Sequence, residues 1–237
     1  MQELITGTGN VMLYFIIAAS SAAAARFLLP IPHEVFRKIL HCILLGSLLC
    51  FLYSFETWWI SALTAIGFAL VVYPILMLLE RIERFSEFIT ERKKGELKSS
   101  LLLVFGMFAF IITVCWGLLG DPYLVLASVY AWGFGDAAAA LIGKRFGKHK
   151  IRWKYTDGKK SAEGSTAMYV LSFVTVCIIL MCRGGMDLAE YILISAIMAL
   201  VSMLAELYSK NGIDTIICPV CAMFALLFML YVTGGLV

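Results

Sequence analysis

Four acidic residues are predicted to lie at the same membrane face as a strongly basic segment of the chain, a combination suited to holding a metal ion on a phosphate chain. The acids are Asp136, Glu163, Glu206 and Asp214, and the basic segment spans residues 144–165. Carboxylate oxygens suit Mg²⁺, which takes one or two carboxylates plus water and substrate phosphates. Lysines and exposed backbone N–H groups suit the phosphates themselves. The pattern therefore predicts a site for a nucleotide or polyphosphate bound with Mg²⁺.

The basic segment does not have the spacing of a Walker loop. Gly143 and Gly147 are too close together for GxxxxGK[ST], and Lys148 is followed by His149. No strand pattern precedes the segment, so the usual P-loop geometry is not expected. Glycines at 143, 147, 158 and 164 would still let the backbone approach a ligand closely.

Asp136 lies inside an apolar run that should form a membrane helix. At 100° per residue it shares a narrow stripe with Gly133, Ala140, Gly143 and, if the helix persists, Gly147. Small residues on such a stripe let helices pack closely, so the carboxylate is expected to face the protein interior. An Asp at a helix centre costs about 2.5–3.5 kcal/mol on insertion scales and usually has a partner or a function. With the helix ending at residue 143, Asp136 would lie at most about 10 Å below the inner surface.

A second polar group lies near the start of the second apolar run. Arg37 and His41 are four residues apart on one helix face, and Lys38 lies beside them. Taken alone, Arg37 and Lys38 would be interfacial anchors and His41 a polar residue with an internal partner.

The elements that must position these residues are membrane helices. Hydrophobic residues make up 62% of the chain and charged residues 15%, against about 45–50% and 25% in soluble domains. Apolar runs long enough to cross a bilayer, each about 17–25 residues, occur near 8–29, 36–54, 57–79, 99–119, 122–143, 164–182, 187–207 and 215–235. The sequence predicts an all-α bundle of eight transmembrane helices forming a single domain, 1–237.

The cations predict how this bundle is oriented. Eight spans place 18 of the 19 Lys and Arg residues on one side of the membrane and leave Arg183 on the other. By the positive-inside rule, the loop at 144–163 faces the cytoplasm and both termini lie outside. The segment 80–98 alternates charged and apolar residues and is expected to form an amphipathic helix on the cytoplasmic membrane surface.

Four sequence pieces, taken in order, resemble the CTP-dependent polyprenol kinase family, which includes dolichol kinase, phytol kinase and CTP-dependent diacylglycerol kinase. They are RKILH at 37–41, GDAAAALIGKRFGK at 135–148, KKSAEGS at 159–165 and AELYSKNGIDTIICP at 205–219. The most specific part is the Asp-x-x-Ala-x-x-x-Gly-x-x-x-Gly run followed by Lys-Lys-Ser-x-Glu-Gly, which is the CTP-binding signature of that family.

The resemblance implies a kinase that moves the γ-phosphate of CTP to the hydroxyl of a membrane lipid. The residues it implies for nucleotide binding are Arg37, Lys38, Ala139, Gly143, Lys144, Gly147, Lys159, Lys160, Ser161 and Gly164. Mg²⁺ would be held by ligands from Asp136, Glu163, Glu206 and Asp214, and one of these acids or His41 would accept the hydroxyl proton. The expected partners are CTP, a lipid alcohol and the membrane, with no nucleic acid.

Two other functions fit parts of the pattern. A phosphatidate cytidylyltransferase also joins CTP, Mg²⁺ and a membrane lipid, but it releases pyrophosphate and forms a CDP-lipid. A transporter, with Asp136 as an ion or proton site, would need no nucleotide. The sequence leaves open which lipid alcohol is used, which residue is the base and the oligomeric state.

Overall fold

Among the residues that the structure describes, eight helices are long and apolar enough to cross a membrane, as the sequence predicts. The computed structural model describes residues 1–81, 95–153, 156, 158, 160–209 and 212–235, and within them it contains helices and no strand. The helices are α1 (Gln2–Leu28), α2 (His33–Tyr53), α3 (Trp58–Leu79), α5 (Glu96–Ile111) with its π-helical continuation η1 (Ile112–Leu118), α6 (Pro122–Phe146), α7 (Ala162–Arg183), α8 (Leu188–Tyr208) and α9 (Asp214–Thr233). The all-α membrane bundle is therefore confirmed.

The predicted surface helix over 80–98 cannot be compared with the structure in full, because residues 82–94 lie outside the described part of the chain. At its two ends, the Lys98 ammonium lies 2.6 Å from a carboxylate oxygen of Glu80. This ion pair joins the residue that follows α3 to the first turns of α5.

The helices divide into two compact units, Met1–Thr113 and Val114–Val237. The first unit contains α1, α2, α3 and α5. Its core is aromatic: the rings of Phe15 and Phe68 stack with centroids 4.7 Å apart, and Phe105 contacts both of them as well as Phe51 and Phe108. Our prediction that the chain acts as one domain stays a prediction.

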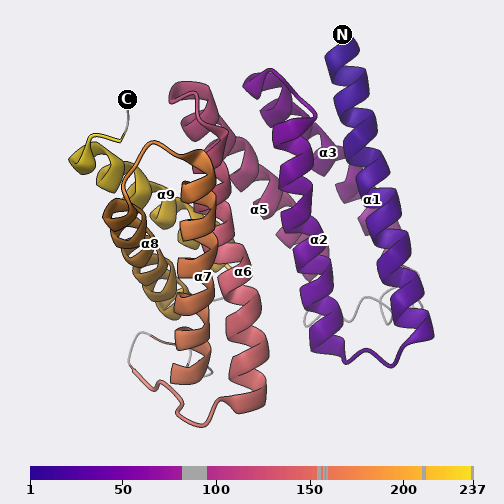
Figure 1. The fold of residues 1–237 in the computed structure, drawn as a ribbon. Helices are drawn as coiled ribbons and strands as arrows, with labels where there is room; N and C mark the ends of the chain where they lie inside the picture. The colour runs from indigo at the N-terminus through magenta and orange to yellow at the C-terminus, as the bar shows by residue number, and fades with distance from the viewer. Residues whose placement is uncertain (82–94, 154–155, 157, 159, 210–211, 236–237) are drawn as a thin grey trace. The chain divides into compact units, whose positions relative to one another are not determined.

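The second unit consists mainly of α6, α7, α8 and α9, which succeed each other in alternating directions (Figure 1). Helix α6 is the most deeply buried of the four and contacts the other three. It begins at Pro122, whose fixed φ suits a first helical turn, and the Asp121 side chain accepts a hydrogen bond from Tyr123 N at 2.9 Å.

Small residues let α6 and α7 approach closely. A Cβ placed on Gly164 of α7 would lie 2.9 Å from the Ala139 carbonyl oxygen and 3.3 Å from Gly143 Cα. Deeper in the unit, the Ser172 hydroxyl donates to the Ala131 carbonyl across the same two helices. The predicted packing stripe on α6 is thus confirmed at Gly143.

Candidate active site at the loop end of the second unit

Alternating helix direction brings three of the four predicted acids to one end of the second unit and the fourth toward it. Glu163 is in the first turn of α7, Glu206 in the last turn of α8, and Asp214 is the first residue of α9. Asp136 lies inside α6, ten residues before that helix ends at Phe146. At 1.5 Å per residue this is about 15 Å from the helix end, compared with about 10 Å for a helix that ends at Gly143.

The loop between α6 and α7 begins where Gly147 ends the helix. Gly147 N donates to the Gly143 carbonyl at 3.2 Å, and a Cβ at Gly147 would contact that same carbonyl and the Ser161 hydroxyl. At the far end of the loop, Ser161 caps α7 by accepting a hydrogen bond from Gly164 N at 3.2 Å. Glycine is therefore needed at 147 for steric reasons, whatever its role toward a nucleotide.

The two ends of the loop run side by side in opposite directions. Lys150 and Ser161 form an isolated antiparallel bridge. Ile151 N donates to the Lys160 carbonyl, and Ala162 N donates to the His149 carbonyl, both at 2.9 Å. These bonds fold the basic segment back against the start of α7.

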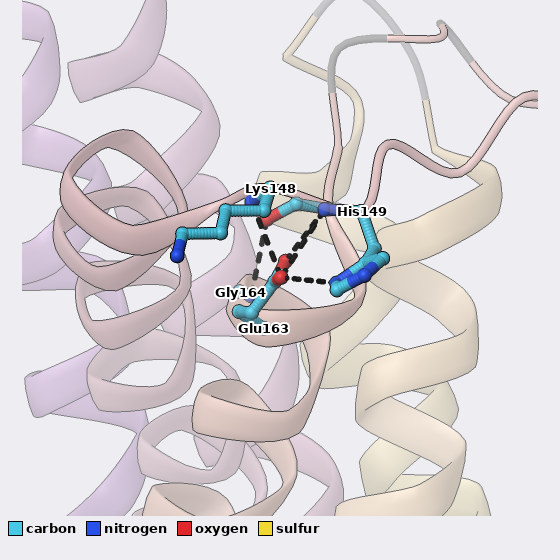
Figure 2. A network of polar contacts seen from close by, with 5 residues as sticks. Lys148, His149, Glu163 and Gly164 are labelled. Atoms are coloured by element: carbon cyan, nitrogen blue, oxygen red, sulfur yellow. Dashed lines mark hydrogen bonds and ion pairs between the residues drawn. The ribbon is translucent and has the colours of Figure 1, made fainter.

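Glu163 ties the start of this loop to α7. Its Oε1 accepts from the backbone N–H groups of Lys148 and His149, both at 3.1 Å, and His149 N also lies 3.3 Å from Oε2. The His149 ring adds a contact of 2.7 Å between Nδ1 and Oε1 (Figure 2). The Glu163 side chain is 26% exposed and that of His149 82% exposed.

Lys160 ties the other end of the loop to α8. Its Nζ lies 3.0 Å from Glu206 Oε1 and donates to the backbone carbonyls of Glu206 and Ser209. The last carbonyls of a helix have no partner within the helix, and a lysine at this end satisfies them and complements the helix dipole. Lys160 therefore has a structural role at the end of α8.

Glu206 is the most buried of the four acids at this end of the unit. Its carboxylate is largely buried, and both Asp136 and Asp214 lie close enough to act on its charge, as does Lys160. Within the described residues, no group of three or more His, Cys, Asp and Glu side chains converges closely enough to hold a metal ion. The predicted magnesium ligands stay predictions, and the carboxylate donors fit an ion that takes one or two of them and completes its shell with phosphates and water.

The remaining predicted residues are placed as follows. Ala139 and Gly143 form the packing contact with Gly164, and Lys144 is exposed in the last turn of α6. Lys159 lies outside the described residues. Arg37, Lys38 and His41 belong to the first unit, on α2, where Arg37 pairs with Glu34 and Lys38 is buried. The roles of all these residues toward a nucleotide stay predictions.

Two groups of contacts in the second unit are not predicted from the sequence. His149 joins the Glu163 network, which depends on the loop folding back and has no local signal. At the other end of the unit, Arg183 Nε lies 2.5 Å from Asp121 Oδ2, and Nη2 donates to the Gly235 carbonyl at 2.9 Å. A shallow cavity of about 390 Å³ opens beside this pair.

The fold and the site together define a polytopic membrane protein in which one buried acid, Glu206, and three half-buried acids lie toward the end that carries a basic loop. Over 202 residues the chain is 30% identical to the phytol kinase of Synechocystis sp., covering 79% of this chain and 76% of that protein. A stretch of 49 residues is 49% identical to the dolichol kinase of Saccharomyces cerevisiae, covering 21% of this chain and 8% of that kinase. The chain belongs to the polyprenol kinase family. No protein-family model and no solved structure matches it.

Proposed function

We propose that this protein phosphorylates the hydroxyl of a membrane lipid alcohol, with CTP as the phosphoryl donor. The observation that carries the proposal is the similarity to a phytol kinase over 79% of the chain. The stretch shared with a dolichol kinase supports the same class of acceptor, a long-chain alcohol. The CTP-binding signature, from Asp136 to Gly164, supports CTP as the donor.

In phosphoryl transfer the protein does little covalent chemistry, and catalysis depends on positioning the reactants and on stabilising charge. The loop end of the second unit offers both. Exposed cations at the end of α6 and in the loop, Arg145 and Lys148 among them, would bind the phosphates of CTP. Acids from this end of the unit would supply the ligands of the accompanying metal ion.

Asp136, the first residue of the CTP-binding signature, and Asp214 are the acids that we propose as the ligands of Mg²⁺. The carboxylate of Glu206 pairs with Lys160, and that of Glu163 accepts backbone N–H groups of the loop. When bound, Mg²⁺ would neutralise negative charge on the phosphates during transfer. Glu206, through its charge, would keep Lys160 at the end of α8 and so fix the end of the loop.

The acceptor would reach the site from the bilayer, with its tail between apolar helix surfaces and its hydroxyl at the level of the loop. The proton of that hydroxyl would pass to one of the acids or to His41, as the resemblance implies. The charge asymmetry of the loops supports a cytoplasmic site. A reporter that is active only in the cytoplasm, fused to the C-terminus, should then be inactive, whereas an active fusion would reverse the proposed orientation.

The function is tested with purified protein in lipid nanodiscs, supplied with Mg²⁺, one nucleotide and one acceptor. The nucleotides are CTP, ATP, GTP and UTP, and the acceptors are phytol, a polyprenol and diacylglycerol. Mass spectrometry of the lipids should show a monophosphate that forms with CTP and with at least one of these alcohols. A lipid product that forms equally with all four nucleotides would contradict CTP as the specific donor, and no phosphorylated lipid under any condition would contradict the kinase.

A further inference from the structure

The carboxylate of Glu163 already binds the loop with both of its oxygens. Oε1 receives two backbone N–H groups, and the His149 ring approaches the same atom to 2.7 Å. Oε2 shares the N–H of His149 at 3.3 Å. The donors come from two consecutive residues, Lys148 and His149, so the carboxylate fixes a single point of the chain.

A metal ion at Glu163 would compete with these donors. Hydrogen bonds to a charged acceptor are among the stronger ones in proteins, and the two backbone N–H groups would lose their acceptor if the carboxylate turned toward an ion. The location of Glu163 in the first turn of α7 already suits a negative charge, because the helix dipole is positive there. The side chain thus has a sufficient structural reason to be acidic without a metal.

The contact with Glu163 restrains the backbone of Lys148 but not its side chain. Its backbone is held by Glu163, while its exposed side chain extends away from the carboxylate (Figure 2). A lysine whose main chain is fixed loses less freedom when its ammonium group binds a phosphate. The neighbouring Lys150 is held differently, by the backbone bridge to Ser161.

We propose that Glu163 is a positioning residue that fixes the start of the basic loop and presents the Lys148 ammonium to the phosphates of the nucleotide. This inference rests on the proposed function for the identity of the ligand. The clamp itself, a carboxylate holding two backbone amides, does not depend on that function and can be measured without a substrate.

The first measurement is hydrogen exchange of the Lys148 and His149 amides in the full-length protein. Glu163→Ala should speed the exchange of both amides at least about tenfold, the effect of losing hydrogen bonds to a charged acceptor. The matched control is Glu190→Ala, which removes an acid from the first turn of α8 where it also accepts a backbone N–H, from Asp187 at 3.0 Å. Exchange at Lys148 and His149 should be unchanged in this control. Protection of the α7 amides reports that each variant is folded.

Unchanged exchange at Lys148 and His149 in a folded Glu163→Ala protein would overturn the clamp, even if activity is lost. Faster exchange would establish the clamp even if the protein uses no CTP. A failure of the proposed function is therefore distinguishable from a failure of this inference.

The second measurement is kinetic and separates a positioning role from a metal ligand. Glu163→Gln should raise the KM for CTP several-fold and leave the Mg²⁺ concentration for half-maximal activity unchanged. Lys148→Ala should raise the KM for CTP about tenfold, the loss of one lysine–phosphate contact, and Lys150→Ala clearly less. A shift in the Mg²⁺ requirement of Glu163→Gln at unchanged KM for CTP would make Glu163 a metal ligand, and an equal or larger effect of Lys150→Ala would overturn the assignment of Lys148.

Discussion

Replacing Gly164 by alanine tests whether close packing of α6 against α7 holds the loop end together. The added methyl group would lie 2.9 Å from the Ala139 carbonyl oxygen, 3.3 Å from Gly143 Cα and 3.3 Å from the Ser161 hydroxyl. The nearest of these atoms belongs to the backbone of a buried helix, so it cannot move aside as the end of a flexible side chain can. The two helices must instead separate by several tenths of an ångström.

The expected magnitude follows from two opposing effects. Overpacking a close contact costs about 1–3 kcal/mol, whereas exchanging glycine for alanine inside a helix gains up to about 1 kcal/mol. We expect Gly164→Ala to be destabilising by about 1–2 kcal/mol, and to lower activity further because Ser161 and Glu163, which flank the loop, move with α7.

The control is Gly106→Ala in α5, where a Cβ would meet no atom within 4 Å. This change should leave the melting temperature the same or raise it, because alanine has a higher helix propensity than glycine and the added methyl group meets no other atom. Both variants are compared with the parent by thermal unfolding in the same detergent. A Gly164→Ala protein that melts at or above the parent would refute the close α6–α7 contact.

Three further variants probe other contacts of the second unit. Lys160→Met keeps most of the unbranched side chain but leaves Glu206 without its cation. Breaking a largely buried pair should cost about 3–5 kcal/mol, part of which Glu206→Gln in the same chain should restore. Arg183→Met removes the ion pair with Asp121 and should lower the melting temperature in detergent while leaving the KM for CTP unchanged, since that pair lies at the opposite end of the unit. Asp136→Asn should reduce the rate of lipid phosphorylation at least about a hundredfold, by analogy with other electrostatic groups at transferring centres, and should not lower the melting temperature. Near-normal activity of this variant would show that Asp136 is not a metal ligand.

The helices could be predicted from the sequence because each is an apolar run of membrane length, and hydrophobicity alone sets that length. Their ends were less predictable. Helix α6 runs to Phe146 rather than to residue 143, since Lys144 and Arg145 complement the negative end of the helix dipole and nothing before Gly147 stops the helix. Asp136 is therefore further from the end of its helix than predicted.

The candidate site could be predicted as a set of residues but not as a set of contacts. The resemblance identifies Lys160 and Glu163 as members of a nucleotide signature. It does not reveal that Lys160 binds the end of α8, 46 residues further along the chain, or that Glu163 binds the amides of Lys148 and His149. Such contacts depend on how the loop folds back over the helix ends, and a sequence motif does not determine that loop conformation.

The most direct test of the proposed function follows two labels on CTP through a single reaction. Purified protein and Mg²⁺ are incubated with the preferred lipid alcohol or, as the acceptor that a cytidylyltransferase needs, with phosphatidate, and with CTP carrying radioactive phosphorus at either the α or the γ position. A kinase should transfer the γ label to the lipid and leave the α label in CDP. Recovery of the α label in the lipid, with release of pyrophosphate, would instead show a cytidylyltransferase and contradict the transfer proposed here.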